Sequence, residues 1–352
     1  MTRAHIAGIG FYVPEKVVTN QDLSKVMDTS DEWIQERTGI KERRYGVKHK
    51  ETTATMGAEA AKIALERAGI TAEDVDFIIF ATLSPDYYFP GSGVLLQRIL
   101  GIKGCGALDI RNQCSGFVYG LSIADQYVKS GMYKNVLLVG AEFHSAGLDF
   151  STKGRDVTVI FGDGAGAAVI QPTDDESEGI LTTHLHADGE HAEQLAFFNM
   201  GCHGGVFMDE DNQPHYMEDE PEFGGIVITP GMVEHDECYP YMNGRYVFKY
   251  AVEKFPAVIM EACQATGHSV GDIDMLIPHQ ANLRIAQFVA KKLQLGPNQV
   301  YNNIQKYGNT TAASIPIALC EAWEKGLIKK GDLVCLAAFG SGFTWASALI
   351  RW

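Results

Sequence analysis

The chain has 352 residues, of which 46% are hydrophobic and 21% charged, a composition typical of a globular protein and not of a disordered one. Its formal net charge of −15 argues against a nucleic-acid partner, and its apolar runs are far shorter than the ~20 residues that cross a bilayer, which argues against membrane insertion. Because no secretory signal opens the sequence, we expect a cytoplasmic protein.

The first half of the sequence alternates helical and strand-like segments. Apolar spacing predicts a helix over residues 51–69, where Gly69 is a favourable C-cap. Buried strands are predicted at residues 74–84 and 134–142, with a helix at 91–101 between them. This alternation indicates an α/β fold whose strands are covered on both faces.

Cys114 lies where a strand-like segment, residues 108–110, leads into apolar residues at helical spacing. The free N–H groups and positive end of a helix favour a thiolate, so this position predicts a lowered thiol pKa. Gly116 would let the backbone approach a substrate. Buried cysteines are commonly inert, however, and the seven cysteines are scattered without C-x-x-C pairs, which argues against a disulfide framework.

Acidic residues are concentrated in the middle of the chain. Residues 156–244 contain 19 Asp and Glu and no Lys or Arg. The rest of the chain therefore contains the other 25 acidic residues and all 29 basic residues. Within this section, residues 199–243 form an irregular insert of a length typical of functional or disordered loops. We expect a pocket cover or dimer element there and no metal site, because the spacing of its Cys and His residues fits no closed zinc pattern: Cys202, His203, His215, His235 and Cys238.

The second half of the sequence repeats the first. Residues 258–280 match residues 61–83, with Asp274 answering Asp76, and residues 331–340 parallel residues 134–142. Within these segments the paired residues are 198 positions apart, both for Asp274 with Asp76 and for Val334 with Val136. The repeat predicts two duplicated α/β halves, residues 1–174 and 175–352, packed with pseudo-twofold symmetry.

Two polar residues of the second half lie where reactive groups are expected. His279 follows a predicted strand at its C-terminal end, where open α/β sheets place ligands. Asn309 lies in a loop before a predicted helix and, at the same offset, answers Arg111 close to Cys114. A structural histidine and an N-cap asparagine are the ordinary alternatives. Pseudo-twofold packing would bring Asn309 and Cys114 together.

A series of motifs in fixed order resembles the β-ketoacyl-acyl-carrier-protein synthase III family of the thiolase superfamily. The resemblance covers nearly the whole chain, through DEWIQERTGIKER, NQCSGF, IFGDGAGAAV, LHADG, PHQANLRI, GNTTAAS and AFGSGFTWASALI. It implies a five-layered αβαβα thiolase-like fold and a homodimer, with a coenzyme A thioester as substrate and no metal or redox cofactor.

The resemblance also implies a mechanism. Cys114 would accept an acyl group from an acyl-CoA as a thioester. His279 and Asn309 would assist decarboxylation of a malonyl-acyl carrier protein and stabilise the enolate oxygen, where hydrogen bonds act on developing charge. The carbanion would then attack the thioester and give a 3-oxoacyl-acyl carrier protein. The backbone N–H groups of Cys114 and Ser341 are matched to the oxyanion hole of this second step.

Substrate-binding residues are implied in the same way. Trp33 and Arg155 match the pair that sandwiches the adenine of CoA, and Arg37 belongs to the same site. Phe89 and Phe161 match the acyl pocket, Phe89 by reaching across the dimer. A core tryptophan, surface arginines and core phenylalanines are the ordinary alternatives. The resemblance also implies a basic face that docks the acidic carrier protein, for which a solvated helix face is the ordinary alternative. This face comprises Lys249, Arg284, Lys291 and Lys292.

Three departures from the family pattern concern the acyl substrate more than the chemistry. Asn112 and Gln113 stand before the nucleophile in place of small residues, and Ser341 replaces a glycine. The acidic insert is longer by about thirty residues than in compact members. A thiolase-fold acyltransferase, or a polyketide-type synthase of secondary metabolism with another acyl acceptor, therefore stays an alternative, whereas a non-catalytic partner subunit is disfavoured by the intact trio of Cys114, His279 and Asn309.

Overall fold

Two mixed β-sheets form the centre of the computed structural model, which describes residues 3–198, 230–234 and 238–352. The five-stranded sheet has the order β1 (Arg3–Tyr12), β7 (Gly164–Thr173), β6 (Val136–Glu142), β4 (Phe77–Ala81) and β5 (Gly106–Ile110). The four-stranded sheet has the order β11 (Met275–Pro278), β12 (Leu333–Gly340), β13 (Thr344–Arg351) and β8 (Gly179–Ala187).

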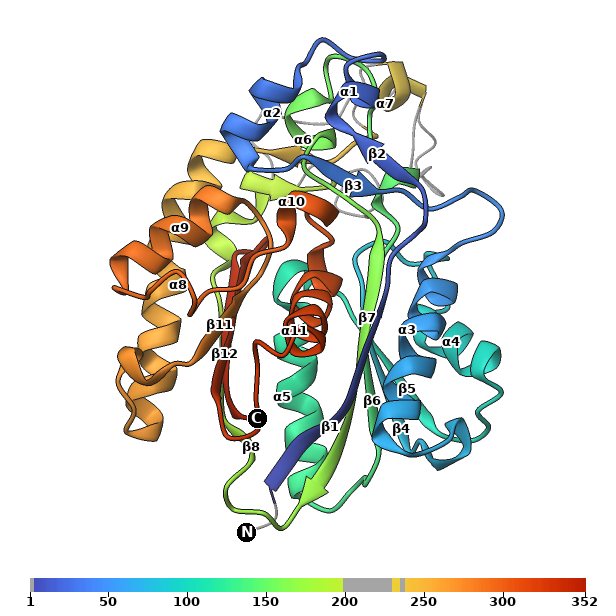
Figure 1. Ribbon diagram of the computed structural model, residues 1–352. Helices are drawn as coiled ribbons and strands as arrows, with labels where there is room; N and C mark the ends of the chain where they lie inside the picture. The colour runs from blue at the N-terminus through green and yellow to red at the C-terminus, as the bar shows by residue number, and fades with distance from the viewer. Residues whose placement is uncertain (1–2, 199–229, 235–237) are drawn as a thin grey trace.

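Helices cover both sheets and separate them (Figure 1). One outer face carries α8 (Gly244–Thr266) and α9 (Leu283–Lys292), and the other carries α3 (Thr53–Ala68) and α4 (Ser92–Leu100). Between the sheets lie α5 (Gly116–Lys129) and α11 (Ser314–Glu324). These are the five layers, αβαβα, that the sequence predicts.

The two sheets repeat one another in register. β4 runs parallel to β6 with Phe77 opposite Val136, and β11 runs parallel to β12 with Met275 opposite Val334. Each residue of the second pair follows its counterpart by 198 positions, the offset found in the sequence. The predicted duplication of α/β halves is confirmed. The division of the chain between residues 174 and 175 stays a prediction.

Local sequence explains how α3 lies on its sheet. The Thr52 side chain accepts a hydrogen bond from the N–H of Thr55 at the start of the helix, and Gly69 ends it with φ 67°, as predicted. In β1, a Cβ on Gly8 would lie 2.2 Å from the carbonyl oxygen of Ala64. Only glycine at this position lets the backbones of helix and strand approach so closely.

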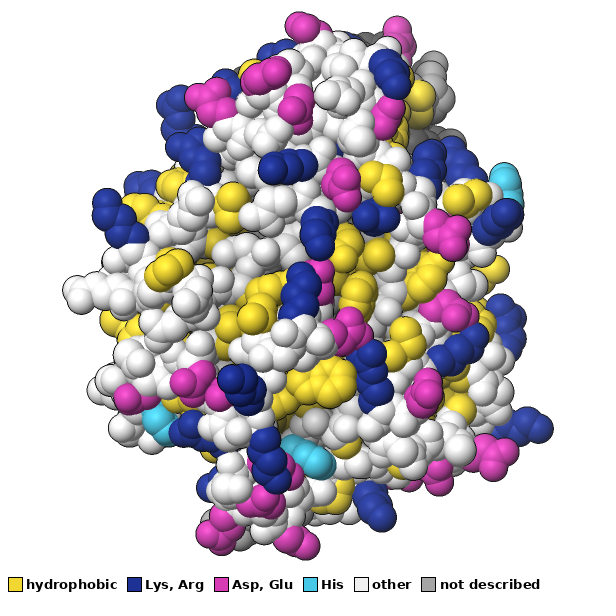
Figure 2. Space-filling view, in the orientation of Figure 1, with side chains coloured by type: hydrophobic (Ala, Val, Ile, Leu, Met, Phe, Trp, Pro, Cys, Tyr) yellow, Lys and Arg dark blue, Asp and Glu magenta, His cyan; other side chains and the backbone are white. Residues whose placement is uncertain are grey.

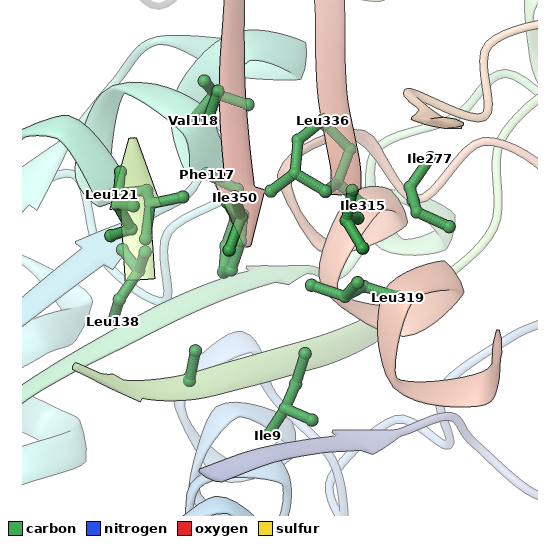
Figure 3. Packing of buried hydrophobic residues seen from close by; sticks show 14 of the residues in the cluster. Ile9, Phe117, Val118, Leu121, Leu138, Ile277, Ile315, Leu319, Leu336 and Ile350 are labelled. Atoms are coloured by element: carbon green, nitrogen blue, oxygen red, sulfur yellow. The ribbon is translucent and has the colours of Figure 1, made fainter. Parts of the chain in front are cut away.

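Residues of both halves share one hydrophobic core between the sheets. Figure 3 shows side chains of α5, α11 and several strands packed together there. Burial of this apolar surface fixes α5 and α11 relative to both sheets, and so fixes the position of their N-termini. The residues labelled in that view are Ile9, Phe117, Val118, Leu121, Leu138, Ile277, Ile315, Leu319, Leu336 and Ile350.

Short elements gather at one end of the molecule (Figure 1) and form a cap. They pack on a small core of their own, and the buried Arg43 guanidinium joins them by donating to the Asn20 side chain and the Val159 carbonyl, at 2.7 Å each. The cap comprises β2 (Val17–Thr19), α1 (Asn20–Leu23), α2 (Asp31–Thr38), β3 (Glu42–Arg44), α6 (Arg155–Thr158) and α10 (Ile304–Tyr307).

The acidic insert falls largely outside the described residues. Beside it, β9 (Leu195–Ala196) pairs with β10 (Tyr241–Met242), and α7 (Pro230–Glu234) is described by itself. Among the described residues, no helix combines the length and the apolar character needed to cross a membrane.

Candidate active site

Cys114 lies in a tight turn between a strand and a helix, as predicted from the sequence. A short 3-10 helix, Gln113–Ser115, leads directly into α5, and Gln113 has a left-handed φ of 43°. The cysteine is 7% exposed. The end of β12 lies against it, since a Cβ on Gly340 would come within 2.5 Å of the cysteine Cβ and 2.8 Å of Sγ. Only glycine at position 340 leaves room for the thiol.

The Cys114 thiol is protonated at neutral pH in this structure. Burial raises its pKa to about 12, and the Glu142 carboxylate adds to the shift, while the backbone N–H groups of Cys114 and Ser341 partly oppose it. The lowered pKa predicted from the helix start is therefore wrong, because the loss of solvent outweighs the helix terminus. The two N–H groups that act on the thiol are those predicted to form the oxyanion hole.

His279 is fixed at one ring nitrogen and unpaired at the other. It follows the last residue of β11, and its backbone N–H donates to the Ala337 carbonyl at 2.8 Å. Nδ1 lies 2.6 Å from Oγ of Ser314, whereas Nε2 is buried without a hydrogen-bond partner. Burial lowers the pKa of the imidazole to about 3, so the ring is neutral.

The neighbours of Ser314 favour one tautomer of His279. The Ser314 oxygen accepts from the backbone N–H of Gln280 at 3.3 Å, and its hydroxyl hydrogen is available to donate to Nδ1, 2.6 Å away. A ring that accepts at Nδ1 carries its proton at Nε2. The unpaired Nε2 is then a hydrogen-bond donor.

Asn309 is oriented by its own turn. Its Oδ1 accepts from the backbone N–H of Thr311 at 2.8 Å, so Nδ2 is the end of the amide left to donate. Its backbone N–H donates to Ile160 at 2.9 Å, and its carbonyl accepts from Gly162 at 3.0 Å. The loop is thereby fixed to the N-terminal half on both sides of Phe161.

These segments meet in one buried region. The turn with Cys114 contacts the end of β12 and the 3-10 turn Thr311–Ala313 that follows Asn309, and that turn continues into α11, whose Ser314 holds His279. The predicted convergence of these three chain segments is therefore observed. The catalytic roles of the three residues stay predictions.

Two buried titratable residues beside this region were missed by the sequence reasoning. Glu142, at the end of β6, is fully buried, and burial raises its pKa to about 7. His144 lies with Nε2 2.8 Å from Oγ1 of Thr311, and burial lowers its pKa to about 3. A signal for Glu142 was present, because a single acid ends the apolar strand 134–142.

The residues predicted to bind CoA lie together in the cap. The guanidinium carbon of Arg37 is 4.3 Å from the Trp33 ring centroid, and that of Arg155 is 5.1 Å from it. Arg155 also donates to the Asp28 carbonyl at 2.7 Å and lies 3.6 Å from its carboxylate. This cluster offers flat cationic and aromatic faces.

The two predicted acyl-pocket residues have different surroundings. The Phe161 ring is 4.8 Å from that of His144, and Phe161 forms a β-bridge with Asn309, which places it beside the candidate active site. Phe89 is 81% exposed on the chain's own surface. Within the chain, only Phe161 adjoins the site.

Comparisons with known proteins give the family. Models described as 3-oxoacyl-[acyl-carrier-protein (ACP)] synthase III and its C-terminal part match residues 108–189 and 263–352. The beta-ketoacyl-[acyl-carrier-protein] synthase III of Xanthomonas euvesicatoria is 46% identical over 349 residues, which are 99% of this chain and 98% of the relative. That of Caldanaerobacter subterraneus is 46% identical over 350 residues, with the same coverage.

A solved structure agrees with these relatives. The crystal structure of 3-oxoacyl-[acyl-carrier-protein] synthase III from Aquifex aeolicus matches with a TM-score of 0.85 and 42% identity, over 100% of both chains. The chain belongs to the synthase III family. The predictions of thiolase fold, condensing enzyme and acyltransferase class are confirmed. The alternative of another acyl acceptor is not favoured, because the curated relatives that are 46% identical over 99% of the chain are synthase III enzymes.

In this condensing enzyme, the four residues predicted to dock a carrier protein are exposed on neighbouring helices. Lys249 lies on α8, and Arg284, Lys291 and Lys292 lie on α9. The Lys292 ammonium also donates to the Val252 carbonyl of α8 at 3.5 Å. Figure 2 shows Lys and Arg side chains gathered over α9 and α2 on that face.

The insert of this synthase III chain gives no test of the metal prediction. Cys202, His203, His215 and His235 lie outside the described residues. Elsewhere, ligand atoms of three side chains come within 4.8 Å of one another, a grouping that is common without an ion: Asp188, Glu190 and His191.

Proposed function

We propose that the enzyme transfers an acyl group from an acyl-CoA to Cys114 and then condenses it with a malonyl-acyl carrier protein. In the first step, the sulfur attacks the thioester carbonyl, the bond to CoA breaks, and the thiol proton leaves with the CoA thiol. The observation that carries this proposal is a buried thiol on which two backbone N–H groups converge, those of Cys114 and Ser341. Such donors stabilise the oxyanion of a tetrahedral intermediate.

The second step needs donors for an enolate. Loss of carbon dioxide from the malonyl group leaves negative charge on the thioester oxygen. Nε2 of His279 is buried without a hydrogen-bond partner, and Nδ2 of Asn309 is available to donate because Oδ1 of the same amide accepts from Thr311. Because His279 is neutral, it donates a hydrogen bond without carrying a charge into the buried site. The carbanion then attacks the acyl-Cys114 carbonyl, the bond to sulfur breaks, and the 3-oxoacyl-acyl carrier protein leaves. The departing thiolate takes a proton from solvent, which regenerates the thiol. No step is assigned to a metal or redox cofactor.

We propose that the CoA adenine binds against Trp33. Arg155 and Arg37 provide guanidinium planes for stacking, and both lie close to the indole. Entry of a purine between Trp33 and Arg155 requires the guanidinium to leave its present position beside Asp28.

A homodimer would use the exposed edge of the five-stranded sheet. β5 ends that sheet, and the loop between β4 and α4 exposes Tyr87, Tyr88 and Phe89, by 56%, 57% and 81%. An unpaired edge strand beside exposed aromatic residues is typical of an association surface. In such a dimer, Phe89 would close the acyl pocket of the second copy. The homodimer and a cytoplasmic location stay predictions.

Carrier-protein docking is tested by charge reversal. The double variant R284E/K291E should raise the KM for malonyl-acyl carrier protein about threefold to tenfold at low salt and leave kcat unchanged, because exposed charges act mainly on the association rate. Steady-state kinetics at two ionic strengths measure the effect. K330E reverses a charge on a lysine that is 76% exposed elsewhere, and it serves as the control. An unchanged KM at low salt would remove this surface from the mechanism.

Stepwise loading tests the proposed function as a whole. The protein is incubated with a panel of acyl-CoAs, and intact mass shows which acyl group it retains. Malonyl-acyl carrier protein is then added, and carbon dioxide and the 3-oxoacyl product are measured. We expect loading by at least one acyl-CoA, followed by product release. Loaded enzyme that releases no carbon dioxide would contradict the condensing step and keep only the acyl transfer.

A further inference from the structure

The turn that carries Cys114 has a structural counterpart in the second half. At the offset of 198, Gln113–Ser115 corresponds to Thr311–Ala313, and both 3-10 turns lead into the helices of the central layer. Both begin with a left-handed residue, Gln113 at φ 43° and Thr311 at φ 47°. Ala312 therefore stands where the duplicated half has Cys114.

The oxyanion hole also has a counterpart. Its two N–H groups belong to Cys114 and Ser341, so the corresponding N–H groups belong to Ala312 and Phe143. The first donates to Oε1 of Glu142 at 3.5 Å. The second donates at 2.9 Å to Oγ of Ser84, whose hydroxyl in turn donates to Oε2 of Glu142. One N–H group therefore meets the Glu142 carboxylate directly and the other meets it through the Ser84 hydroxyl, so the carboxylate and this hydroxyl together occupy the counterpart of the oxyanion hole.

Glycine stands at the corresponding place in the active half. Gly340 is the counterpart of Glu142, and a Cβ there would collide with Cys114. The two halves therefore differ at paired positions. One has a cysteine beside a glycine, and the other has an alanine beside a glutamate.

The same carboxylate joins two segments that border the active site. Oε2 accepts from Oγ1 of Thr82 at 3.1 Å and from the backbone N–H groups of Leu83 and Ser84 at 3.2 and 3.1 Å. This stretch leads toward the loop with Phe89. The contact with Ala312 reaches the other segment, the turn that orients the amide of Asn309.

We propose that Glu142 is a positioning residue of the condensing reaction, whose carboxylate, together with the Ser84 hydroxyl, fills the duplicated oxyanion hole and thereby fixes the turn that orients Asn309. The proposal deepens the proposed function and rests on it for the role of Asn309. Glu142 contacts no reacting atom, and it acts through Ala312 and through its charge beside Cys114.

Because Glu142 carries a titratable charge, its effect on Cys114 should depend on pH, whereas a purely structural effect would not. The titratable group on which it acts is the Cys114 thiol, and the imidazole of His144, two residues along the chain, is kept neutral by burial. With its pKa raised to about 7, the carboxyl is neutral below that pH and ionised above it. Ionisation of Glu142 should therefore suppress the Cys114 thiolate only as pH rises through this range.

The test compares E142Q with the wild type in alkylation of Cys114 by iodoacetamide, quantified by peptide mass. At about pH 8.5 the variant should react about threefold to tenfold faster, and at about pH 6 the two proteins should react alike. The same ratio of E142Q to wild-type alkylation rates at both pH values would overturn the proposed effect of the Glu142 charge. This assay needs no substrate, so its failure is distinguishable from failure of the proposed function.

A second variant tests the positioning effect. E142D keeps the charge but shortens the side chain, so alkylation should follow the wild-type pH profile while carbon dioxide release from malonyl-acyl carrier protein by the pre-acylated enzyme falls about tenfold. Release at the wild-type rate would overturn the positioning role. D163N is the matched control, since Asp163 is also buried with its pKa raised to about 6 but bonds to Gly46 and Ser145. It should change neither readout.

Discussion

Replacing Cys114 with alanine should abolish acyl loading and reduce condensation by on the order of 10^4-fold, because the acyl group then has no sulfur to form a thioester with. The measurement is intact mass after incubation with the acyl-CoA that loads the wild type, together with the rate of 3-oxoacyl product formation. The rest of the site remains in the variant, since Gly340 already leaves the space around position 114 open to a smaller side chain.

A second buried cysteine provides the control for this experiment. Cys335 lies in β12 and is 0% exposed, and burial raises the pKa of its thiol well above the ordinary value. C335A removes another buried thiol and should still load one acyl group. If C114A acquired the acyl mass, the nucleophile would be a different residue.

H279A and N309A should separate the two half-reactions. Each variant should still acquire the acyl group on Cys114, but carbon dioxide release from malonyl-acyl carrier protein should slow by about 10^2-fold to 10^3-fold, the effect of removing one oxyanion donor. The reason is that Nε2 of His279 is buried without a partner and Nδ2 of Asn309 is the end of the amide left to donate. Stopped-flow measurement of carbon dioxide from pre-acylated enzyme gives the rate.

The pH dependence adds a check on the state of His279. Burial lowers the pKa of its imidazole from 6.5 to about 3, so the neutral ring persists as pH falls through the ordinary titration range of histidine. The rate of decarboxylation by pre-acylated enzyme should therefore show no decrease between about pH 7 and pH 5 that is due to His279. No decrease seen in the wild type over this range should disappear in H279A. H268A, which removes a partly buried histidine bound to Arg351, is the control and should behave as the wild type. Abolished loading in H279A would instead place the imidazole in the acylation step.

Most of the fold could be predicted because duplication shows itself along the chain. The match of Asp76 with Asp274 found the offset, and the same two carboxylates accept backbone N–H groups at the starts of β6 and β12, at 2.8 and 2.7 Å from Asn135 and Leu333. The predicted strand at 74–84 is shorter in the structure, since β4 ends at Ala81. After it, the chain bends so that Thr82 donates to Glu142, a contact 60 residues apart in sequence.

The site was predictable at residues whose type indicates their chemistry. Cys114 and His279 each follow a strand, all three residues precede a helix, and the order of Cys114, His279 and Asn309 along the chain fits one family. Ser314 and Thr311, which orient His279 and Asn309, are ordinary hydroxyl residues whose importance lies in contacts that only the folded chain makes. The prediction of a lowered thiol pKa was wrong for a similar reason, because burial and the carboxylate of Glu142 come from distant segments.

The unequal halves determine the stoichiometry of the reaction. A symmetric ancestor with a cysteine at both turns would hold two acyl groups per chain, whereas Ala312 and Glu142 leave only one of the two turns able to do so. In the proposed mechanism, each chain therefore holds one acyl group at a time. Saturating acyl-CoA should add a single acyl mass per subunit. The turn before α11 then has a structural role and supports the turn before α5.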